Sequence, residues 1–122
     1  MLIINMKDKL IKKAQNYYLL GLFAEKRNMN SESVSNYFKS LFALADLQIY
    51  LISTKIAKNH TERFELLKKH DEFLYNLLDG LFIIYRDTYT KEITDVRVKF
   101  VREKLNEAFE HTKVEKPTEK DL

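Results

Sequence analysis

This sequence of 122 residues contains no cysteine, no tryptophan, one proline and two glycines. Without cysteine the chain can form no disulfide, no thiolate nucleophile and no cysteine-ligated zinc site. Two glycines are too few for a glycine-rich phosphate loop or a dinucleotide-binding fingerprint. The scarcity of glycine and proline also disfavours a turn-rich β fold and favours long helices.

Hydrophobic residues make up 45% of the chain and charged residues 32%, a balance typical of a globular protein with a core. No apolar run approaches the roughly 18 residues that a membrane-spanning helix needs. The apolar start, residues 1–4, is too short for the core of a signal peptide, because charged residues follow from Lys7 onward. The sequence therefore predicts one cytoplasmic domain with no membrane attachment.

Apolar residues recur every three and four positions in four long segments, which predicts amphipathic helices. We expect the four long helices at residues 6–27, 32–55, 71–85 and 92–111. A further short helix is expected at residues 61–69, between the second and the third of them. Residues 1–112 should thus form one all-α, up-and-down bundle of four long helices plus a short one. Residues 113–122 hold the only proline and almost no apolar side chain, so we expect a disordered tail.

Charge is unevenly distributed along the chain. Residues 1–13 contain four lysines and one aspartate, residues 55–70 contain five basic and two acidic residues, and residues 71–95 contain two basic and six acidic residues. A basic patch near residues 55–70 would attract a phosphate ligand or RNA. The alternative is an ordinary solvated surface whose opposite charges pair within the bundle or across a dimer.

Several short motifs follow one another along the chain. Residues 35–45 read SNYFKSLFALA, in which paired aromatic residues precede small ones. Residues 58–60 read KNH, and after a short helix an apolar helix ends in YRDTY at residues 85–89. A last amphipathic helix follows. In these motifs and their order, the chain resembles the HEPN domain family of small helical bacterial and archaeal proteins, over about residues 10–110.

The resemblance implies a bundle of four long helices and a short one, usually assembled as a homodimer. Many members of the family stand beside a small nucleotidyltransferase in toxin–antitoxin or defence modules. The active members are metal-independent ribonucleases, in which an Arg is followed after four to six residues by a His, just before the last helix. Arg holds the scissile phosphate and His transfers a proton, and two copies of the motif meet across the dimer.

Arg86 and Asp87 occupy the family position of the Arg and its polar neighbour. Residues 91–93 stand where the family has His, and none of them is His. Tyr89 is the nearest group with a transferable proton, and a tyrosine hydroxyl is a poor base at neutral pH. The sequence therefore favours a non-enzymatic or weakly active protein, with a ribonuclease that uses Arg86 and Tyr89 as the alternative.

Two further groups of residues are candidates. Arg63 and His70 have the bare Arg–His spacing and share a helix face, although they precede the family position. Lys58 and His60 precede the short helix, whose free N–H groups favour an anion. Asn59 and Glu62 in the same region have the spacing of a capping box. The three histidines of the chain show no metal-ligand spacing, and we expect no metal or cofactor.

These considerations predict a HEPN-like dimeric binding module. Its ligand would be a nucleotidyltransferase-type partner or the phosphate of a nucleotide or RNA. The expected ligand-binding residues are Arg86, Asp87, Tyr89, Lys58 and His60. The alternatives are a metal-independent ribonuclease, with Arg86 and Tyr89 or with Arg63 and His70 as catalytic residues, and a purely structural helical interaction domain.

Overall fold

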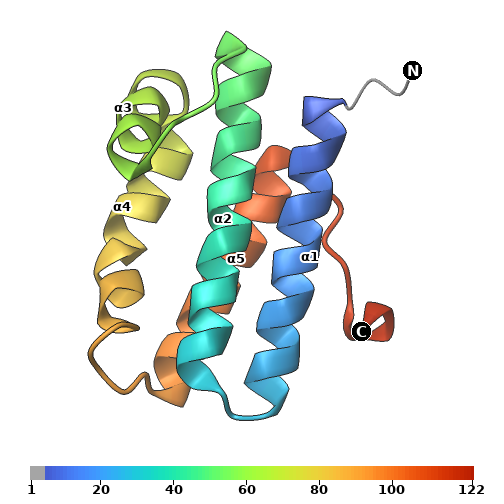
Figure 1. The fold of residues 1–122 in the computed structure, drawn as a ribbon, viewed down its shortest axis with the longest axis vertical. Coiled ribbons are helices and arrows are strands. Elements are labelled where there is room, and N and C mark those ends of the chain that lie inside the picture. The colour runs from blue at the N-terminus through green and yellow to red at the C-terminus, as the bar shows by residue number, and fades with distance from the viewer. Residues whose placement is uncertain (1–4) are drawn as a thin grey trace.

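The computed structural model describes residues 5–122, so the apolar start at residues 1–4 lies outside the described part. The described part contains no strand, and its helices are α1 (Met6–Lys26), α2 (Asn30–Ser53), α3 (His60–His70), α4 (Glu72–Asp87), α5 (Asp95–Thr112) and the 3-10 turn η1 (Glu119–Asp121). The four long helices run alternately down and up, and α3 lies across one end (Figure 1). The expected all-α bundle is confirmed. None of these helices is long and apolar enough to cross a membrane.

Helix α2 is the centre of the bundle, as its wide apolar surface indicates. It contacts α1, α3, α4 and α5. Its side chains Tyr37 and Phe38 are completely buried, and Phe109 of α5 is almost so. The aromatic rings of Tyr37 and Phe109 both pack against Tyr18 of α1, with ring centroids 5.8 and 5.5 Å from that of Tyr18. These tyrosines and phenylalanines therefore belong to the core.

Small residues allow α1 and α2 to approach closely. Gly21 of α1 lies against the ring of Tyr37, where a side chain at position 21 would overlap ring atoms. Two buried serines of α2 form hydrogen bonds from their hydroxyl groups to backbone carbonyls of α1. Ser33 donates to the Gly21 carbonyl at 2.8 Å, and Ser40 donates to the Ala14 carbonyl at 2.6 Å. Both serines thus add hydrogen bonds to the packed interface without leaving an unsatisfied polar group.

Two helices begin at other residues than the hydrophobic periodicity predicts, and side-chain hydrogen bonds explain both differences. Helix α2 starts at Asn30, whose side-chain amide donates to the Ile93 carbonyl at 2.9 Å and to Asp95 Oδ1 at 2.8 Å. Helix α5 starts at Asp95 instead of residue 92, because Thr94 accepts from the amide of Arg97 at 3.2 Å and caps the helix there. The loop before α5 is consequently longer than expected and is tied to the start of α2.

The cap of α3 follows the predicted capping box in part. Asn59 Oδ1 accepts from the Glu62 amide at 2.9 Å, as expected. The Glu62 carboxylate, however, accepts from the amide of Lys58 at 3.3 Å and not from that of Asn59. The cap therefore orders the connection one residue further upstream than the usual box does.

A buried carboxylate joins α3 to α4. The Asp71 amide donates to the Leu67 carbonyl at the end of α3 at 2.7 Å, and Asp71 Oδ1 accepts from the Leu74 amide at 3.0 Å and so begins α4. Gln48 of α2 donates to Asp71 Oδ2 at 3.1 Å, and His111 Nε2 of α5 lies 2.9 Å from the same oxygen. Four helices thus meet at one residue, α3 at its backbone amide and the other three at its carboxylate.

The C-terminal segment, residues 113–122, differs from the expected disordered tail. It folds back along α1 and ends in η1 (Figure 1). Val114 is buried, Gln15 donates to the Glu115 carbonyl at 2.9 Å, and Lys26 forms an ion pair with Glu119 at 2.9 Å. One apolar anchor and a few polar contacts therefore position a segment whose composition alone indicates no core contribution.

We expect Gly21→Ala to lower the free energy of unfolding by about 1–3 kcal/mol, the usual cost of overpacking a core. Gly80→Ala is the matched control, because a methyl at position 80 would meet no atom within 4 Å. Helix propensity alone should make that variant more stable, by up to about 1 kcal/mol. Urea unfolding in dilute solution, followed by circular dichroism, measures both. Equal effects of the two substitutions would contradict the close packing of α1 on α2.

Candidate functional site

Arg63 of α3 connects the predicted site residues to α2. Its guanidinium donates to both carboxylate oxygens of Asp46, from Nε to Oδ1 at 2.7 Å and from Nη2 to Oδ2 at 3.0 Å. The same guanidinium lies over the ring of Phe42, 4.8 Å from the ring centroid. A bidentate ion pair and a cation–π contact together hold the guanidinium in one orientation.

His60 lies beside this pair, and its ring nitrogen Nδ1 is 2.7 Å from Arg63 Nη1. Because a guanidinium can only donate, Nδ1 of His60 must be the acceptor, and the proton of the neutral imidazole is on Nε2. The ring packs on Phe42, with 4.6 Å between the centroids. Burial of the ring and then the positive charge of Arg63 lower the pKa of His60 below its ordinary value. His60 is consequently a neutral hydrogen-bond donor.

Tyr85 and Tyr89 extend the cluster toward the end of α4. The ring of Tyr85 meets that of Phe42 edge-on at 5.2 Å, and its hydroxyl lies 3.0 Å from the hydroxyl of Tyr89. Burial, with the hydrogen bond to Tyr89 adding to it, raises the pKa of Tyr85 to about 12. Tyr89 itself is 73% exposed. Of the predicted residues, His60, Arg63 and Tyr89 are thus brought into one cluster.

The other predicted residues lie apart from this cluster or serve the fold. Asp87 is buried and pairs with Arg97 at 2.9 Å and with Lys91 at 3.6 Å. The hydrogen bond from Arg97 is the main reason that the pKa of Asp87 is lowered. Asp87 therefore tethers the loop between α4 and α5, and its carboxylate is occupied. The neighbouring Arg86 and, before α3, Lys58 are exposed.

The Arg63–His70 spacing does not produce a pair. Within the described residues, no hydrogen bond or ion pair joins these two side chains, because Arg63 is held by Asp46 and His60. His70 is at the other end of α3. Sharing a helix face is therefore not enough to bring the two groups to one ligand.

A groove of about 200 Å³ opens beside Arg63, between α1, α2 and α3. Its walls carry Lys13 and Tyr17 of α1 and Lys39 of α2, and its lining also contains Phe42, Ala43, Asp46 and Arg63. The ammonium of Lys39 lies over the ring of Tyr17, 5.6 Å from the centroid. The groove thus combines three cations with a single carboxylate, which Arg63 already neutralises. We call it the α1–α3 groove.

Sequence reasoning missed Lys13, Lys39 and Asp46 as site residues, and for Tyr17 it favoured core or dimer packing over base stacking. The four-residue spacing of Lys13 and Tyr17 places them on one face of α1, and that signal was available. No local pattern indicated that Asp46 of α2 would meet Arg63 of α3, because 17 positions separate them.

Residues 5–122 contain no group of three or more His, Asp or Glu side chains placed to hold a metal ion. No protein-family model matches the chain, and neither a curated protein nor a solved structure is detectably similar to it. The geometry of the described residues is therefore the basis for assigning a function.

We expect His60 to titrate below the ordinary histidine value of about 6.5. In Arg63→Met its pKa should rise, because the adjacent positive charge is removed while Asp46 remains. Proton–nitrogen NMR correlation spectra over a pH series give both the pKa and the tautomer, which should be Nε2–H in the unsubstituted protein. An unchanged pKa in Arg63→Met would contradict the contact between the two side chains.

Proposed function

We propose that this protein is a non-catalytic, HEPN-like binding module that holds the phosphate groups of RNA in the α1–α3 groove. The observation that carries the proposal is the charge of that groove. Lys13, Lys39 and Arg63 line it together, and its one acid, Asp46, is in a bidentate ion pair with Arg63. Neither ammonium forms an ion pair with any residue of the described part, so both are available to phosphates.

The aromatic groups of the groove suit a nucleic acid better than a free phosphate ion. Tyr17 is half-buried and lies beside two lysines, so a base stacked on its ring would place the adjoining phosphates near cations. Outside the groove lining but next to Arg63, the imidazole of His60 carries an N–H donor at Nε2. Base stacking and phosphate contact are the two elements of sequence-tolerant single-strand binding.

The protonation states favour binding over cleavage. A ribonuclease without metal needs a group that accepts the proton of the 2′-hydroxyl. His60 uses its one lone pair, on Nδ1, to accept from Arg63. Tyr85, with its pKa raised to about 12, holds its proton at neutral pH. The alternative is a ribonuclease that uses the exposed residues Arg86 and Tyr89, with the two copies of the site meeting across a dimer.

We expect a fluorescein-labelled U12 oligonucleotide to bind with a strong salt dependence in fluorescence anisotropy. Lys13→Gln combined with Lys39→Gln should weaken binding and reduce the slope of log K against log salt by about 1.4, the value for two lost phosphate contacts on a single strand. The matched control is Lys99→Gln combined with Lys120→Gln, which removes the same charge from exposed positions outside the groove.

If both double variants lost affinity for the oligonucleotide equally, net charge alone would explain binding. That outcome would contradict the proposed role of the groove. The same oligonucleotide is followed by gel electrophoresis during long incubation. We expect it to stay intact. Cleavage that disappears in Arg86→Ala would instead identify the ribonuclease alternative.

A second observation favours the expected homodimer. An apolar groove of about 340 Å³ lies between α4 and α5, with Leu77, Gly80 and Leu81 in its lining. Two large side chains border it and are each exposed over nearly half of their surface, Phe73 at 46% and Phe100 at 43%. Large apolar side chains gathered around one groove are typical of an interaction surface. We propose that a second copy of the chain covers it, with a nucleotidyltransferase-type partner as the alternative occupant.

Sedimentation velocity should therefore show a dimer, and Phe100→Glu should convert it to a monomer with unchanged helical circular dichroism. Phe23→Glu is the matched control, because Phe23 of α1 is 44% exposed and lies outside this groove. A monomeric unsubstituted protein, or dissociation by Phe23→Glu as well, would count against the α4–α5 face.

A further inference from the structure

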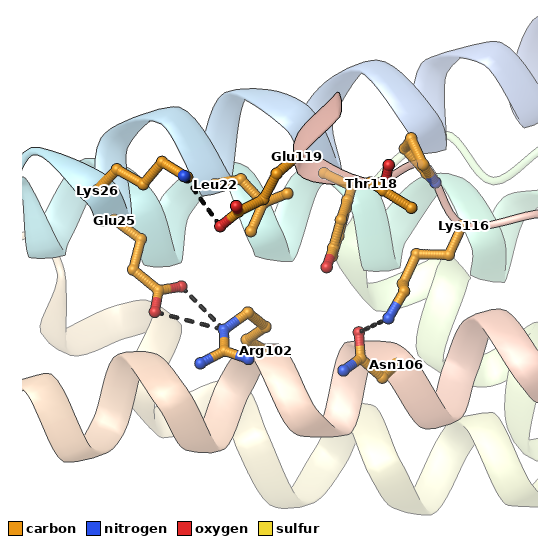
Figure 2. Close-up of a pocket in the computed structure, with 10 residues that line it drawn as sticks. Leu22, Glu25, Lys26, Arg102, Asn106, Lys116, Thr118 and Glu119 are labelled. Atoms are coloured by element: carbon orange, nitrogen blue, oxygen red, sulfur yellow. Dashed lines mark hydrogen bonds and ion pairs between the residues drawn. The ribbon is translucent and has the colours of Figure 1, made fainter. Parts of the chain in front are cut away.

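A third hollow, a cavity of about 450 Å³, lies on the side of α1 away from the α1–α3 groove. Its lining includes Tyr18 and Leu22 of α1, Arg102 and Asn106 of α5, and Lys116 and Pro117 of the C-terminal segment. Figure 2 shows Arg102 and Asn106 on one helix facing Leu22 and Lys26 on another, with Lys116 and Thr118 closing the space between them. A volume of this size is in the range of small-molecule sites.

Tyr18 offers the cavity a hydrogen-bond donor that no residue of the described part uses. Its side chain is only 4% exposed, and its hydroxyl makes no hydrogen bond with any residue in the range 5–122. Burial raises its pKa, so the hydroxyl keeps its proton and remains a donor. The charges that act on this hydroxyl, from Arg102, Glu25 and Glu119, all belong to the cavity lining. Because residues 5–122 contain no fully buried side-chain oxygen that lacks a partner, solvent reaches this hydroxyl from the cavity, and the hydroxyl can donate to a ligand there.

The acids of the cavity are both neutralised within the protein. Glu25 accepts from Arg102 Nε, at 3.0 and 3.3 Å to its two oxygens, and Glu119 pairs with Lys26 at 2.9 Å. Tyr37 adds a third hydrogen bond to Glu25, at 2.6 Å. These contacts leave neither carboxylate free to repel an anion.

Positive groups remain available. Only Nε of Arg102 is engaged, and its two Nη nitrogens make no hydrogen bond in the described part of the chain (Figure 2). The ammonium of Lys116 has a single polar partner, the uncharged Oδ1 of Asn106 at 3.1 Å. Three basic and two acidic side chains line the cavity, so one positive charge is in excess.

We propose that this cavity binds a small organic carboxylate. The two Nη nitrogens of Arg102 match the two oxygens of a carboxylate, and one negative charge balances the one excess positive charge. Lys116 and the Tyr18 hydroxyl supply further donors, and Leu22 and Pro117 face the apolar body of the ligand. A phosphate monoester fits less well, since its charge at neutral pH exceeds the single one that the cavity balances.

The C-terminal segment forms one wall of this cavity, and the ion pair near its end adds little to its hold on α1. The Lys26–Glu119 ion pair is solvent-exposed, with 44% and 66% of the two side chains accessible. Exposed pairs contribute little to stability. A bound carboxylate that contacts both Lys116 and Arg102 would add a further link between the segment and α5. The proposal is independent of RNA binding, because the two sites lie on different sides of α1.

The test is an NMR titration of the ¹⁵N-labelled full chain with phenylacetate, and in parallel with phenylacetamide, which has the same shape and no charge. We expect saturable amide shifts around Tyr18, Arg102 and Lys116 with phenylacetate, and binding of phenylacetamide at least about tenfold weaker, the usual range for losing a charge-assisted hydrogen bond. Absence of saturable shifts with phenylacetate, or equal binding of the amide, would overturn the proposal.

Three variants locate the site. Lys116→Gln should weaken phenylacetate binding about tenfold, whereas Lys120→Gln, an equal charge change at an exposed position outside the cavity, should leave it unchanged. Tyr18→Phe keeps the packed ring and removes only the hydroxyl, so it should weaken binding several-fold without lowering the melting temperature. Equal loss in Lys116→Gln and Lys120→Gln would indicate general attraction to a basic protein and would overturn the assignment.

Discussion

Asp71 joins four helices, α3 through its backbone amide and α2, α4 and α5 through its carboxylate, and the arrangement of the bundle depends on it. It begins α4, and it holds Gln48 of α2 and His111 of α5. Burial opposes its charge, but the hydrogen bonds from Leu74, Gln48 and His111 outweigh burial and keep its pKa below the ordinary value. The stability that this carboxylate contributes is fully present above the unfolded-state pKa of about 4 and is lost as the pH falls through the lower folded-state value.

The same junction positions the candidate site. Helix α3 has only one fully buried side chain, Leu67, so its own apolar contacts fix it weakly. Asn59 at its start and Asp71 at its end set its position, and the ion pair of Arg63 with Asp46 fixes it against α2. Polar contacts thus substitute for apolar burial. The arginine that forms the wall of the α1–α3 groove is also the group that docks the helix.

Helix α1 separates the two proposed sites, and adjacent tyrosines belong to different ones. Tyr17 lines the α1–α3 groove and Tyr18 lines the cavity beside α5, because successive residues of a helix point about 100° apart. One site is built from two lysines, an arginine and the half-buried ring of Tyr17, which suits a polymer. The other is larger, has the C-terminal segment as one wall and offers a guanidinium, an ammonium and the Tyr18 hydroxyl, which suits a small molecule.

Local information in the sequence determined the helices, their approximate ends, the caps at Asn59 and Asp71 and the central place of α2, because periodicity and capping depend on residues a few positions apart. The tertiary structure alone decided which side chains meet. Asp46 of α2 forms an ion pair with Arg63 of α3, and Asp87 forms one with Arg97. Residues 113–122 fold onto α1. The physical reason is that these contacts depend on how the helices pack and on a few polar anchors, and neither leaves a periodic signal in the chain.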